Sequence, residues 1–284
     1  MNKPEIHIVP KQESPKRLSD YAIGIFAGII SKAAVKKAIK KELIEVDGKI
    51  ASTGLFIKGG EKITYKQQES KAIKLELKLE VLFEDDHLAI IIKPAGILVS
   101  GNKLKTIANA LAFNLNKSPL NDALETPLAV HRLDFPTSGL LLIGKTSSTV
   151  IALNKMFENK EIHKTYHAIA IGQMQAQGQI ISEIGGKYAE TEFEVIESQV
   201  SEKFEFLNLV KLNPKTGRRH QLRIHLSEIG SPILGDKEYG KEGLILQGKG
   251  LYLHASSLAF VHPITSESII VNMELPAKFA RIFF

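Results

Sequence analysis

A short polar stretch between two apolar runs constrains the fold of this chain more than any other feature. The apolar residues 127–130 lead into His131-Arg132-Leu133-Asp134, and a Phe-Pro-Thr-Ser-Gly segment leads out into the apolar run 140–143. This pattern is typical of two strands joined by a loop. Because a proline follows closely, Asp134 cannot lie inside a helix, and we expect its carboxylate at the mouth of a sheet. By itself the pattern also fits a loop aspartate that caps a turn and pairs with Arg132.

Three further segments extend the first into an ordered set of four motifs. They are Lys164-Thr165-Tyr166-His167-Ala168, residues 216–226 running on to Gly235-Asp236, and Leu253-His254-Ala255 followed by Phe260-Val261-His262-Pro263. With residues 129–144 they resemble the signature of the RluA-type pseudouridine synthases, which isomerise uridine in RNA. The resemblance covers nearly all of residues 75–284, and four specific motifs in the right order outweigh the reading of Asp134 as a simple turn residue.

The resemblance implies a role for several side chains. Asp134 matches the family's catalytic aspartate, Tyr166 its active-site tyrosine, and Arg223 the cation that keeps the carboxylate charged in a closed site. Arg132 matches the residue that enters the space left when the target base leaves the stack; the alternative is an ion pair with Asp134. Arg218 and Arg219 are further candidate RNA-binding residues, because three arginines within six residues are dense for a near-neutral region.

The chemistry that this implies is an isomerisation. A nitrogen–carbon glycosidic bond breaks, the uracil turns, and the base rejoins the sugar through ring carbon 5. Nothing is oxidised and no water is consumed, so we expect no metal and no cofactor. The aspartate could add to the anomeric carbon, stabilise an oxocarbenium-like centre or remove a sugar proton, and the sequence does not choose among these.

Charge is distributed unevenly along the chain. The net charge is +6, which favours a polyanionic partner. Residues 11–74 hold 14 Lys or Arg against 7 Asp or Glu, whereas residues 75–284 hold 22 against 23. The basic excess therefore lies in the first quarter of the chain, which indicates a separate electrostatic module.

The local sequence of this basic region predicts a small RNA-binding domain. Ser31 can cap a helix over residues 32–41, whose apolar side holds Val35, Ala38 and Ile39. Its cationic side holds Lys32, Lys36 and Lys40, with Lys37 and Lys41 beside them. A strand over 44–50 with an Asp-Gly turn follows. Residues 17–63 resemble the module named after ribosomal protein S-four, with Lys32 where the family usually has arginine; the alternative is a solvated lysine-rich face.

Together these patterns predict an α+β protein of two domains. We expect a small α/β domain over residues 11–70, a polar linker over 67–74, and a catalytic domain over 75–284 around a large bent sheet, mixed or antiparallel. Strands are predicted at 80–84, 88–92, 129–131, 140–143, 165–171, 191–197, 204–212, 251–260 and 269–274. Helices are predicted at 106–115, 147–159 and 221–229.

Composition limits the chemistry and the cell compartment that we expect for this chain. The chain has no cysteine, which excludes disulfides and thiolate chemistry, and it has no apolar run of membrane-spanning length. We therefore expect a cytoplasmic, monomeric protein without a membrane partner. His163 and His167 approach metal-ligand spacing, but no Glu follows His163 and the segment is predicted as a strand, so we do not assign a zinc site.

We therefore expect an RNA pseudouridine synthase that acts on structured RNA, either ribosomal or transfer RNA, with ribosomal RNA preferred. Two alternatives stay open: an RNA-binding protein with an inactive synthase-like domain, and a hydrolytic glycosidase that uses a second carboxylate such as Asp236. One departure concerns the segment 93–99, which resembles a family segment that normally ends in Val-His-Pro. Here Ser100-Gly101-Asn102 takes that place, which bears on the identity of the RNA more than on the reaction.

Overall fold

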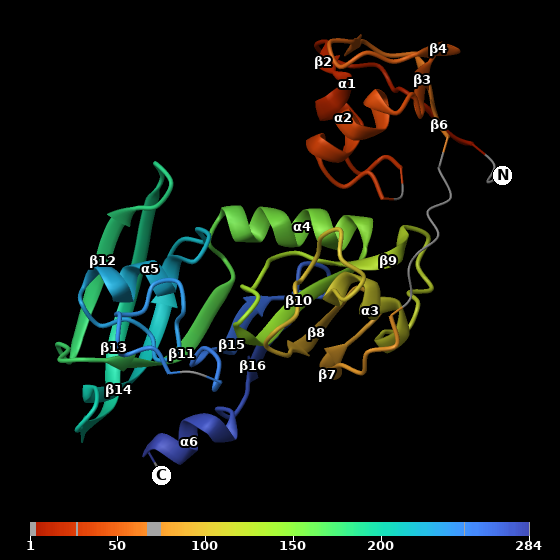
Figure 1. Cartoon of the computed structure of the whole chain (residues 1–284). Coiled ribbons are helices and arrows are strands. Elements are labelled where there is room, and N and C mark those ends of the chain that lie inside the picture. Colours follow the sequence, from red (N-terminus) through yellow and green to blue (C-terminus); the bar gives the residue numbers. More distant parts are fainter. Residues whose placement is uncertain (1–3, 27, 67–74, 247, 284) are drawn as a thin grey trace.

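The structure is a computed structural model that describes residues 4–26, 28–66, 75–246 and 248–283. Two units follow one another along the chain, an N-terminal unit (residues 4–66) and a main unit (residues 75–283) (Figure 1). The expected linker, residues 67–74, lies outside the described residues. No helix in the described ranges is long and apolar enough to span a membrane.

The N-terminal unit packs two short helices against small sheets. Its four-stranded sheet has the order β1-β6-β3-β4, and a second sheet pairs β2 with β5. The elements are β1 (Glu5–Ile8), β2 (Lys16–Arg17), α1 (Leu18–Tyr21), α2 (Lys32–Lys40), β3 (Ile44–Val46), β4 (Lys49–Ile50), β5 (Phe56–Ile57) and β6 (Lys62–Tyr65). Because β1 pairs with β6, this unit begins before residue 11, where the sequence placed its start.

Local chemistry explains why helix α2 and the β3–β4 turn form where the sequence predicts them. The Ser31 hydroxyl accepts a hydrogen bond from the backbone N–H of Ala34 at 3.2 Å and so caps the helix. The three apolar residues predicted to share one side are the buried ones, Val35, Ala38 and Ile39. Positive φ angles at Asp47 (49°) and Gly48 (77°) are typical of the two-residue hairpin turn.

The main unit is built around one large mixed sheet, which confirms the α+β prediction. Its ten strands include the path β12-β13-β14-β11-β15-β10-β8-β7, with β16 beside β15 and β9 beside β10. The strands are β7 (Glu80–Glu84), β8 (Leu88–Lys93), β9 (Ala123–Ala129), β10 (Ser138–Thr146), β11 (His163–Ile171), β12 (Gln177–Glu183), β13 (Tyr188–Ser201), β14 (Glu205–Pro214), β15 (Leu253–Val261) and β16 (Ser268–Asn272). The helices are α3 (Ile107–Asn114), α4 (Ser147–Glu158), α5 (Gln221–Glu228) and α6 (Ala277–Phe283).

The two halves of this sheet join where β10 runs parallel to β15. Ser138 and Gly139 pair with His254 and Ala255 at this point. Gly139 has a φ of +119°, and a side-chain carbon on it would lie 2.2 Å from the carbonyl oxygen of Ala255. Only glycine permits this close approach, so Gly139 fixes the loop that precedes β10 against β15.

Most predicted elements are confirmed, but the expected strand over residues 129–131 is wrong. Strand β9 ends at Ala129, and the next backbone N–H, that of Val130, still donates to Leu142 O at 3.1 Å. The Leu142 N–H then donates to the His131 ring nitrogen Nε2 at 3.0 Å rather than to a backbone carbonyl. A side chain thus ends the ladder, and residues 131–137 form a loop. Strand β12 and helix α6 were not predicted.

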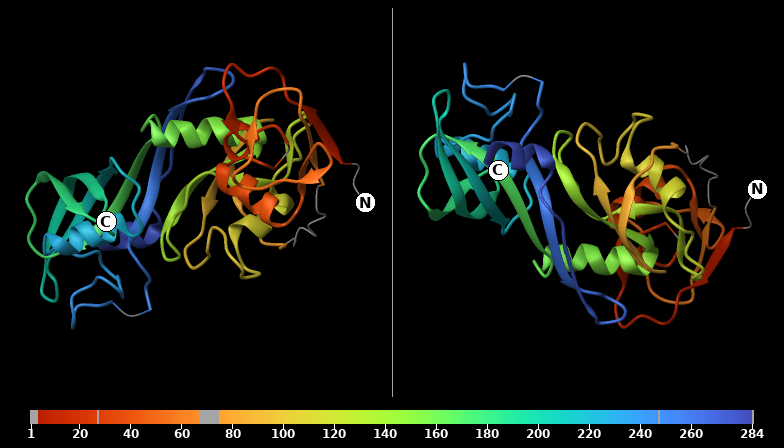
Figure 2. Two further views of the ribbon diagram at one scale, coloured as in Figure 1. Left: turned by 90° about the horizontal axis from the view of Figure 1, so that it is seen from above. Right: turned by 90° about the horizontal axis from the view of Figure 1, so that it is seen from below.

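The N-terminal unit lies over the half of the main unit that contains α4 and β7–β10, as Figures 1 and 2 show from three directions. The Gly28 N–H donates a hydrogen bond to the Ser147 hydroxyl, at the first residue of α4, at 3.2 Å. Buried apolar clusters do not mix between the units: one spans Val9 to Ile63, and the others begin at Leu79.

Candidate active site

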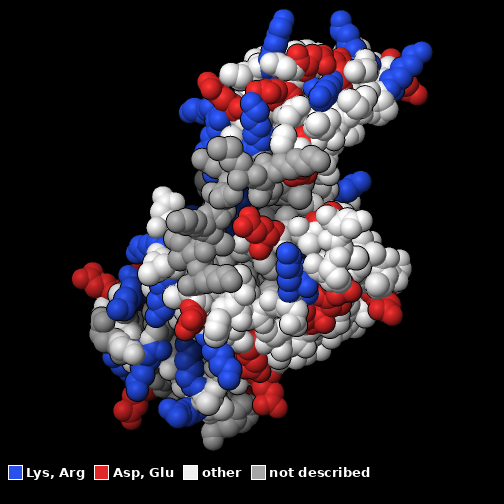
Figure 3. Space-filling model, turned by 90° about the vertical axis from the view of Figure 1, so that its right-hand side faces the viewer, with Lys and Arg blue, Asp and Glu red and all other residues white. Residues whose placement is uncertain are grey.

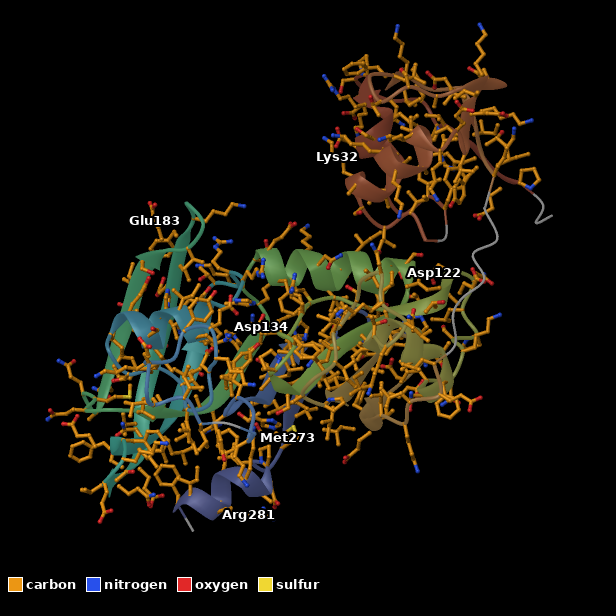
Figure 4. The ribbon with its side chains drawn as sticks, viewed as in Figure 1. Lys32, Asp122, Asp134, Glu183, Met273 and Arg281 are labelled. Carbon is orange, nitrogen blue, oxygen red and sulfur yellow. The ribbon has the colours of Figure 1, made fainter. Side chains whose placement is uncertain are left out.

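Three adjoining pockets form a cleft across the join of the sheet. We call them the central pocket (330 Å³, including Asp134 and Tyr166), the side pocket (520 Å³, including Phe157 and Asn213) and the outer pocket (660 Å³, including Lys237). Arg132 lines all three, and Asp134 lines the central and outer pockets. Figure 4 shows Asp134 in the middle of the main unit, between the two halves of the sheet. The cleft therefore converges on the loop that the sequence singled out.

A buried lysine holds the backbone of the loop that contains Asp134. Lys93 ends strand β8, its residue is fully buried, and its Nζ donates to the carbonyl oxygens of Thr137 (2.6 Å), Pro94 (3.0 Å) and Phe135 (3.4 Å). Burial lowers the pKa of Lys93 to about 8, although the negative charge of Asp134 opposes the shift. Two of the three carbonyls belong to residues that follow Asp134 within three positions, so Lys93 fixes the backbone next to the carboxylate.

Lys93 begins the Lys-Pro-Ala-Gly segment, whose sequence alone predicts no role for this lysine. The one local signal is a lysine at the end of the apolar run 88–92, where a charge is unexpected in a central strand. Residues Ser100 to Asn102, which replace a family segment, belong to the described part of the chain and line none of the three pockets.

Arg223 is brought to Asp134, but its closest partner is another acid. Its Nε and one terminal nitrogen donate to Asp236 at 2.7 Å each, and the same terminal nitrogen donates to Glu238 at 3.2 Å. The other terminal nitrogen lies 4.0 Å from Asp134 Oδ2. The guanidinium also lies over the ring of Tyr239, 4.8 Å from its centroid. Asp236 and Glu238 therefore hold the side of the guanidinium that points away from Asp134, and this orients its other side toward Asp134.

The environment of Asp236 decides its charge. Burial alone raises the pKa of its carboxyl, but hydrogen bonds from Arg223 and from the backbone N–H groups of Glu238 and Tyr239 outweigh burial and hold the pKa below its ordinary value. An ionised, fully paired carboxylate cannot donate a proton to a leaving group. Asp236 thus does not supply the second acid that a hydrolytic glycosidase needs.

Tyr166, the candidate active-site tyrosine, lines the central pocket together with Asp134. Its residue is only 8% exposed. Burial, and after it the negative charge of Asp134, raise the pKa of Tyr166 far above the ordinary value of a phenol. The hydroxyl therefore keeps its proton at neutral pH and can serve as a hydrogen-bond donor, while its ring offers an apolar face.

His220 forms the edge of the site next to Asp134. It precedes helix α5 in the left-handed conformation (φ 57°), which is uncommon for a residue other than glycine. Its Nε2 lies 3.7 Å from Asp134 Oδ1, and its Nδ1 lies 2.9 Å from the Tyr239 hydroxyl. His220 and Arg223 both contact Tyr239, so His220 supports the loop that leads to Arg223.

The remaining arginines of the motifs lie on the cleft surface. Arg132 is exposed and makes no ion pair with Asp134 within the described ranges, so the alternative of a plain pair is not observed. Its neighbour His131 is kept neutral, because burial and then the charge of Lys164 lower its pKa to about 3. Arg218 donates through Nε to the Tyr188 carbonyl at 2.9 Å, and Arg219 is exposed.

The candidate lysines of helix α2 are exposed in the N-terminal unit. Lys32 forms an ion pair with Asp20 at 2.6 Å, whereas Lys36, Lys37 and Lys40 have no ion-pair partner among the residues that the structure describes. Figure 3 shows several Lys and Arg side chains on this unit, with Asp and Glu between them. Lys32 and Asp134 lie in different units and well apart in Figure 4. The structure therefore does not bring these lysines to the cleft.

Comparison with known proteins identifies the family. Residues 87–228 match the family model described as RNA pseudouridylate synthase. The chain is 34% identical to the uncharacterised RNA pseudouridine synthase YhcT of Bacillus subtilis over 89% of this chain and 88% of the relative. The chain belongs to the RNA pseudouridylate synthase family. It is therefore an RNA pseudouridine synthase, and the sequence-based prediction of the enzyme class is confirmed.

Other relatives of this pseudouridine synthase carry more specific names. The ribosomal large subunit pseudouridine synthase C of Rickettsia conorii is 31% identical, over 93% of this chain and 95% of that one. Synthase D of Xanthomonas campestris pv. campestris is 28% identical, over 97% and 90%. Among solved structures, human RNA pseudouridylate synthase domain containing 4 superposes with a TM-score of 0.58 at 25% identity, over 71% of this chain and 90% of that one.

Proposed function

We propose that this pseudouridine synthase isomerises specific uridines of ribosomal RNA and that Asp134 is its catalytic residue. The observation that carries the proposal is the position of Asp134, 15% exposed in its side chain, where the central and outer pockets meet beside buried Arg223 and Tyr166. The names of the Rickettsia and Xanthomonas relatives favour ribosomal over transfer RNA.

The proposed reaction assigns one task to each side chain. The bond between N1 of uracil and C1′ of ribose breaks, a bond between C5 and C1′ forms, and the hydrogen of C5 is lost while N1 regains one, so the product is an isomer. Asp134 acts at the sugar as the anionic group, Arg223 provides the facing positive charge, and the Tyr166 hydroxyl donates a hydrogen bond to the base. The Tyr166 hydroxyl keeps its proton at neutral pH, because burial and then the negative charge of Asp134 raise its pKa.

Access to the target requires that the base leaves its helix. Arg132 is exposed at the point that all three pockets share. We propose that its planar guanidinium stacks in the place of the extruded base and hydrogen-bonds the base left unpaired. Arg218 and Arg219, from the loop on the other side of the central pocket, are proposed to bind the RNA backbone.

The N-terminal unit is proposed to be a separate RNA-binding domain, with the main unit as the catalytic domain. Its support is the basic excess of residues 11–74, the exposed lysines of α2 and a core confined to this unit. The lysines assigned to RNA are Lys32, Lys36, Lys37 and Lys40, of which Lys32 is partly neutralised by Asp20. Because Lys32 lies in another unit, well apart from Asp134 (Figure 4), these lysines would contribute affinity rather than rate.

Substitution of the carboxylate tests the assignment and separates it from an RNA-binding protein with an inactive domain. Asp134→Asn keeps the shape of the side chain and removes its charge, so pseudouridine formation in a large-subunit ribosomal RNA transcript should fall below detection while RNA binding survives. Asp86→Asn, an exposed aspartate in the β7–β8 turn, is the matched control and should act like the wild type. Turnover in Asp134→Asn would refute the catalytic role, and no turnover in the wild type would favour the inactive alternative.

A further inference from the structure

Lys164 carries a positive charge in the cleft that no side chain among the described residues balances. It lies near the start of β11, half-buried, with Nζ 5.5 Å from the centroid of the Phe157 ring. Within the described residues it has no ion-pair or hydrogen-bond partner. Burial lowers the pKa of the Lys164 ammonium, and no carboxylate opposes this effect. A half-buried cation without a counter-ion is costly to hold, which indicates that a ligand supplies the anion.

The neighbouring lysines differ from Lys164 in this respect. Lys215, in the same side pocket, forms an ion pair with Glu192 at 2.6 Å. Lys93 donates to three backbone carbonyls. Lys160 is exposed, where water solvates its charge. Lys164 is thus a half-buried lysine of the cleft wall whose charge is left available.

Its place in the cleft identifies the anion. The central and side pockets share five lining residues, and two of these are cations, Arg132 and Lys164. If the target uridine occupies the central pocket, a nucleotide next to it in the same strand can enter the side pocket. The phosphate that joins the two must then pass the wall between the pockets, where both cations lie.

We propose that Lys164 binds the phosphate between the target uridine and an adjacent nucleotide, and that the side pocket holds that adjacent nucleotide. The proposal rests on the proposed function, because it takes the central pocket as the site of the target. The side pocket has 520 Å³ of space and includes apolar faces of Phe157 and Pro214 on which a base can stack. Of its two acids, Glu192 is neutralised by Lys215 and Glu158 is exposed.

Salt-dependent binding tests the role of Lys164 directly. The probe is an unmodified transcript of large-subunit ribosomal RNA, bound to the full-length chain carrying Asp134→Asn so that no turnover occurs. Adding Lys164→Met should weaken binding roughly tenfold and make the plot of log affinity against log salt less steep by about 0.7 to 1. Lys164→Arg should restore most of both. Lys203→Met is the matched control, because Lys203 also lies over a phenylalanine ring, at 5.3 Å, but outside the cleft.

A second measurement needs no substitution at Lys164. Once the modified position is mapped, two synthetic RNAs can be made, each with one uncharged methylphosphonate linkage on one side of the target uridine. One of the two RNAs should bind more weakly and with a less steep salt dependence. Combined with Lys164→Met, that linkage should cause no further loss. The proposal is overturned if neither neutral linkage changes affinity and slope, or if Lys164→Met changes neither; Lys164 would then be only a packing contact of Phe157. Failure of the proposed function would appear differently, as absent pseudouridine formation by the wild type or as turnover in Asp134→Asn.

Discussion

Asp236 holds Arg223 through two hydrogen bonds of 2.7 Å, and this buried pair points the remaining guanidinium nitrogen at Asp134 across 4.0 Å. The side chain of Asp236 is fully buried, and that of Arg223 is 5% exposed. Asp236 lies at the end of the third motif, and its position in the sequence does not reveal that it orients Arg223. We therefore regard Asp236 as a positioning residue for the proposed catalytic carboxylate.

Replacing Asp236 tests this relationship. Asp236→Asn leaves a buried guanidinium without its charged partner, and we expect the free energy of unfolding to fall by about 3 kcal/mol or more. Turnover should fall on the order of a hundredfold, because Arg223 loses its orientation. Glu238→Gln is the control: Glu238 is 52% exposed and 3.2 Å from Arg223, so its loss should cost less than about 1 kcal/mol. Urea denaturation and single-turnover kinetics measure the two effects separately.

The same pair predicts how stability depends on pH. The pKa of Asp236 is lowered in the folded state, so its contribution is present above the unfolded-state pKa of about 3.9 and is lost as pH falls through the folded-state value. The difference in unfolding free energy between the wild type and Asp236→Asn should therefore be constant near neutral pH and shrink below about pH 4. A difference that does not change with pH would show that Asp236 is not ionised in the fold.

Lys93→Met should separate loop positioning from stability. Without three hydrogen bonds to the backbone around Asp134, turnover should fall roughly tenfold to a hundredfold. Lys145→Met is the matched control, since Lys145 is equally buried but pairs with Glu84 at 2.7 Å, away from the loop. It should lower stability and leave single-turnover rates nearly unchanged. Equal losses of rate in both variants would mean that Lys93 acts only through overall stability.

Lys93 also gives a prediction at alkaline pH. Its pKa in the fold is about 8, below the ordinary value, so the unfolded chain binds more protons between pH 8 and about 10.4. The stability contribution of Lys93 is smallest below pH 8 and should rise through this window by up to roughly 3 kcal/mol. The unfolding free energy of the wild type relative to Lys93→Met, measured from pH 7 upward, should rise accordingly; a fall would contradict the shifted pKa.

Gly139→Ala tests the join between the two halves of the sheet. The added carbon would lie 2.2 Å from the carbonyl oxygen of Ala255, at a φ of +119°, so β10 and β15 must separate. We expect a loss of about 2 to 4 kcal/mol in unfolding free energy together with a large loss of turnover, because Asp134 lies five residues before this point. Gly54→Ala, with an ordinary φ and nothing within 4 Å, should change neither by much.

The lysines of α2 test the RNA-binding role of the N-terminal unit. Replacing Lys36, Lys37 and Lys40 together by Gln should weaken RNA binding and make its salt dependence less steep, since fewer phosphates are neutralised. Turnover at saturating RNA should change much less than affinity, because these contacts are remote from the reacting sugar.

A charge-matched triple variant controls for net charge. Lys78, Lys117 and Lys203 are exposed residues of the main unit outside the three pockets, and their replacement by Gln removes the same charge. Deleting residues 1–74 should act like the α2 variant while the main unit keeps its fold, because the apolar clusters of the two units are separate. An unchanged salt slope in the α2 variant would leave those lysines as a solvated face.

The sequence by itself determined the elements whose causes are local. The Ser31 cap, the apolar side of α2 and the Asp47-Gly48 turn depend on contacts within a few residues, so they could be predicted and are confirmed. The same holds for the pairing of two apolar runs around the Asp134 loop, because strand pattern and proline position are read directly from the chain. The motifs likewise indicated Tyr166, which lines the central pocket, and Arg223, which lines the outer pocket; Asp134 lines both.

Only the tertiary structure decided what holds the site in place. Lys93 reaches the carbonyl of Thr137 across 44 positions of sequence, and Ser138 meets His254 across 116. That Lys164 has no ion-pair partner among the described residues likewise depends on where the fold places the carboxylates. Such contacts carry no local periodicity, because they are set by which strands become neighbours in the sheet, and burial then fixes the charge of each partner. The chain's local patterns therefore specify which groups are present, and the strand order specifies which of them face one another.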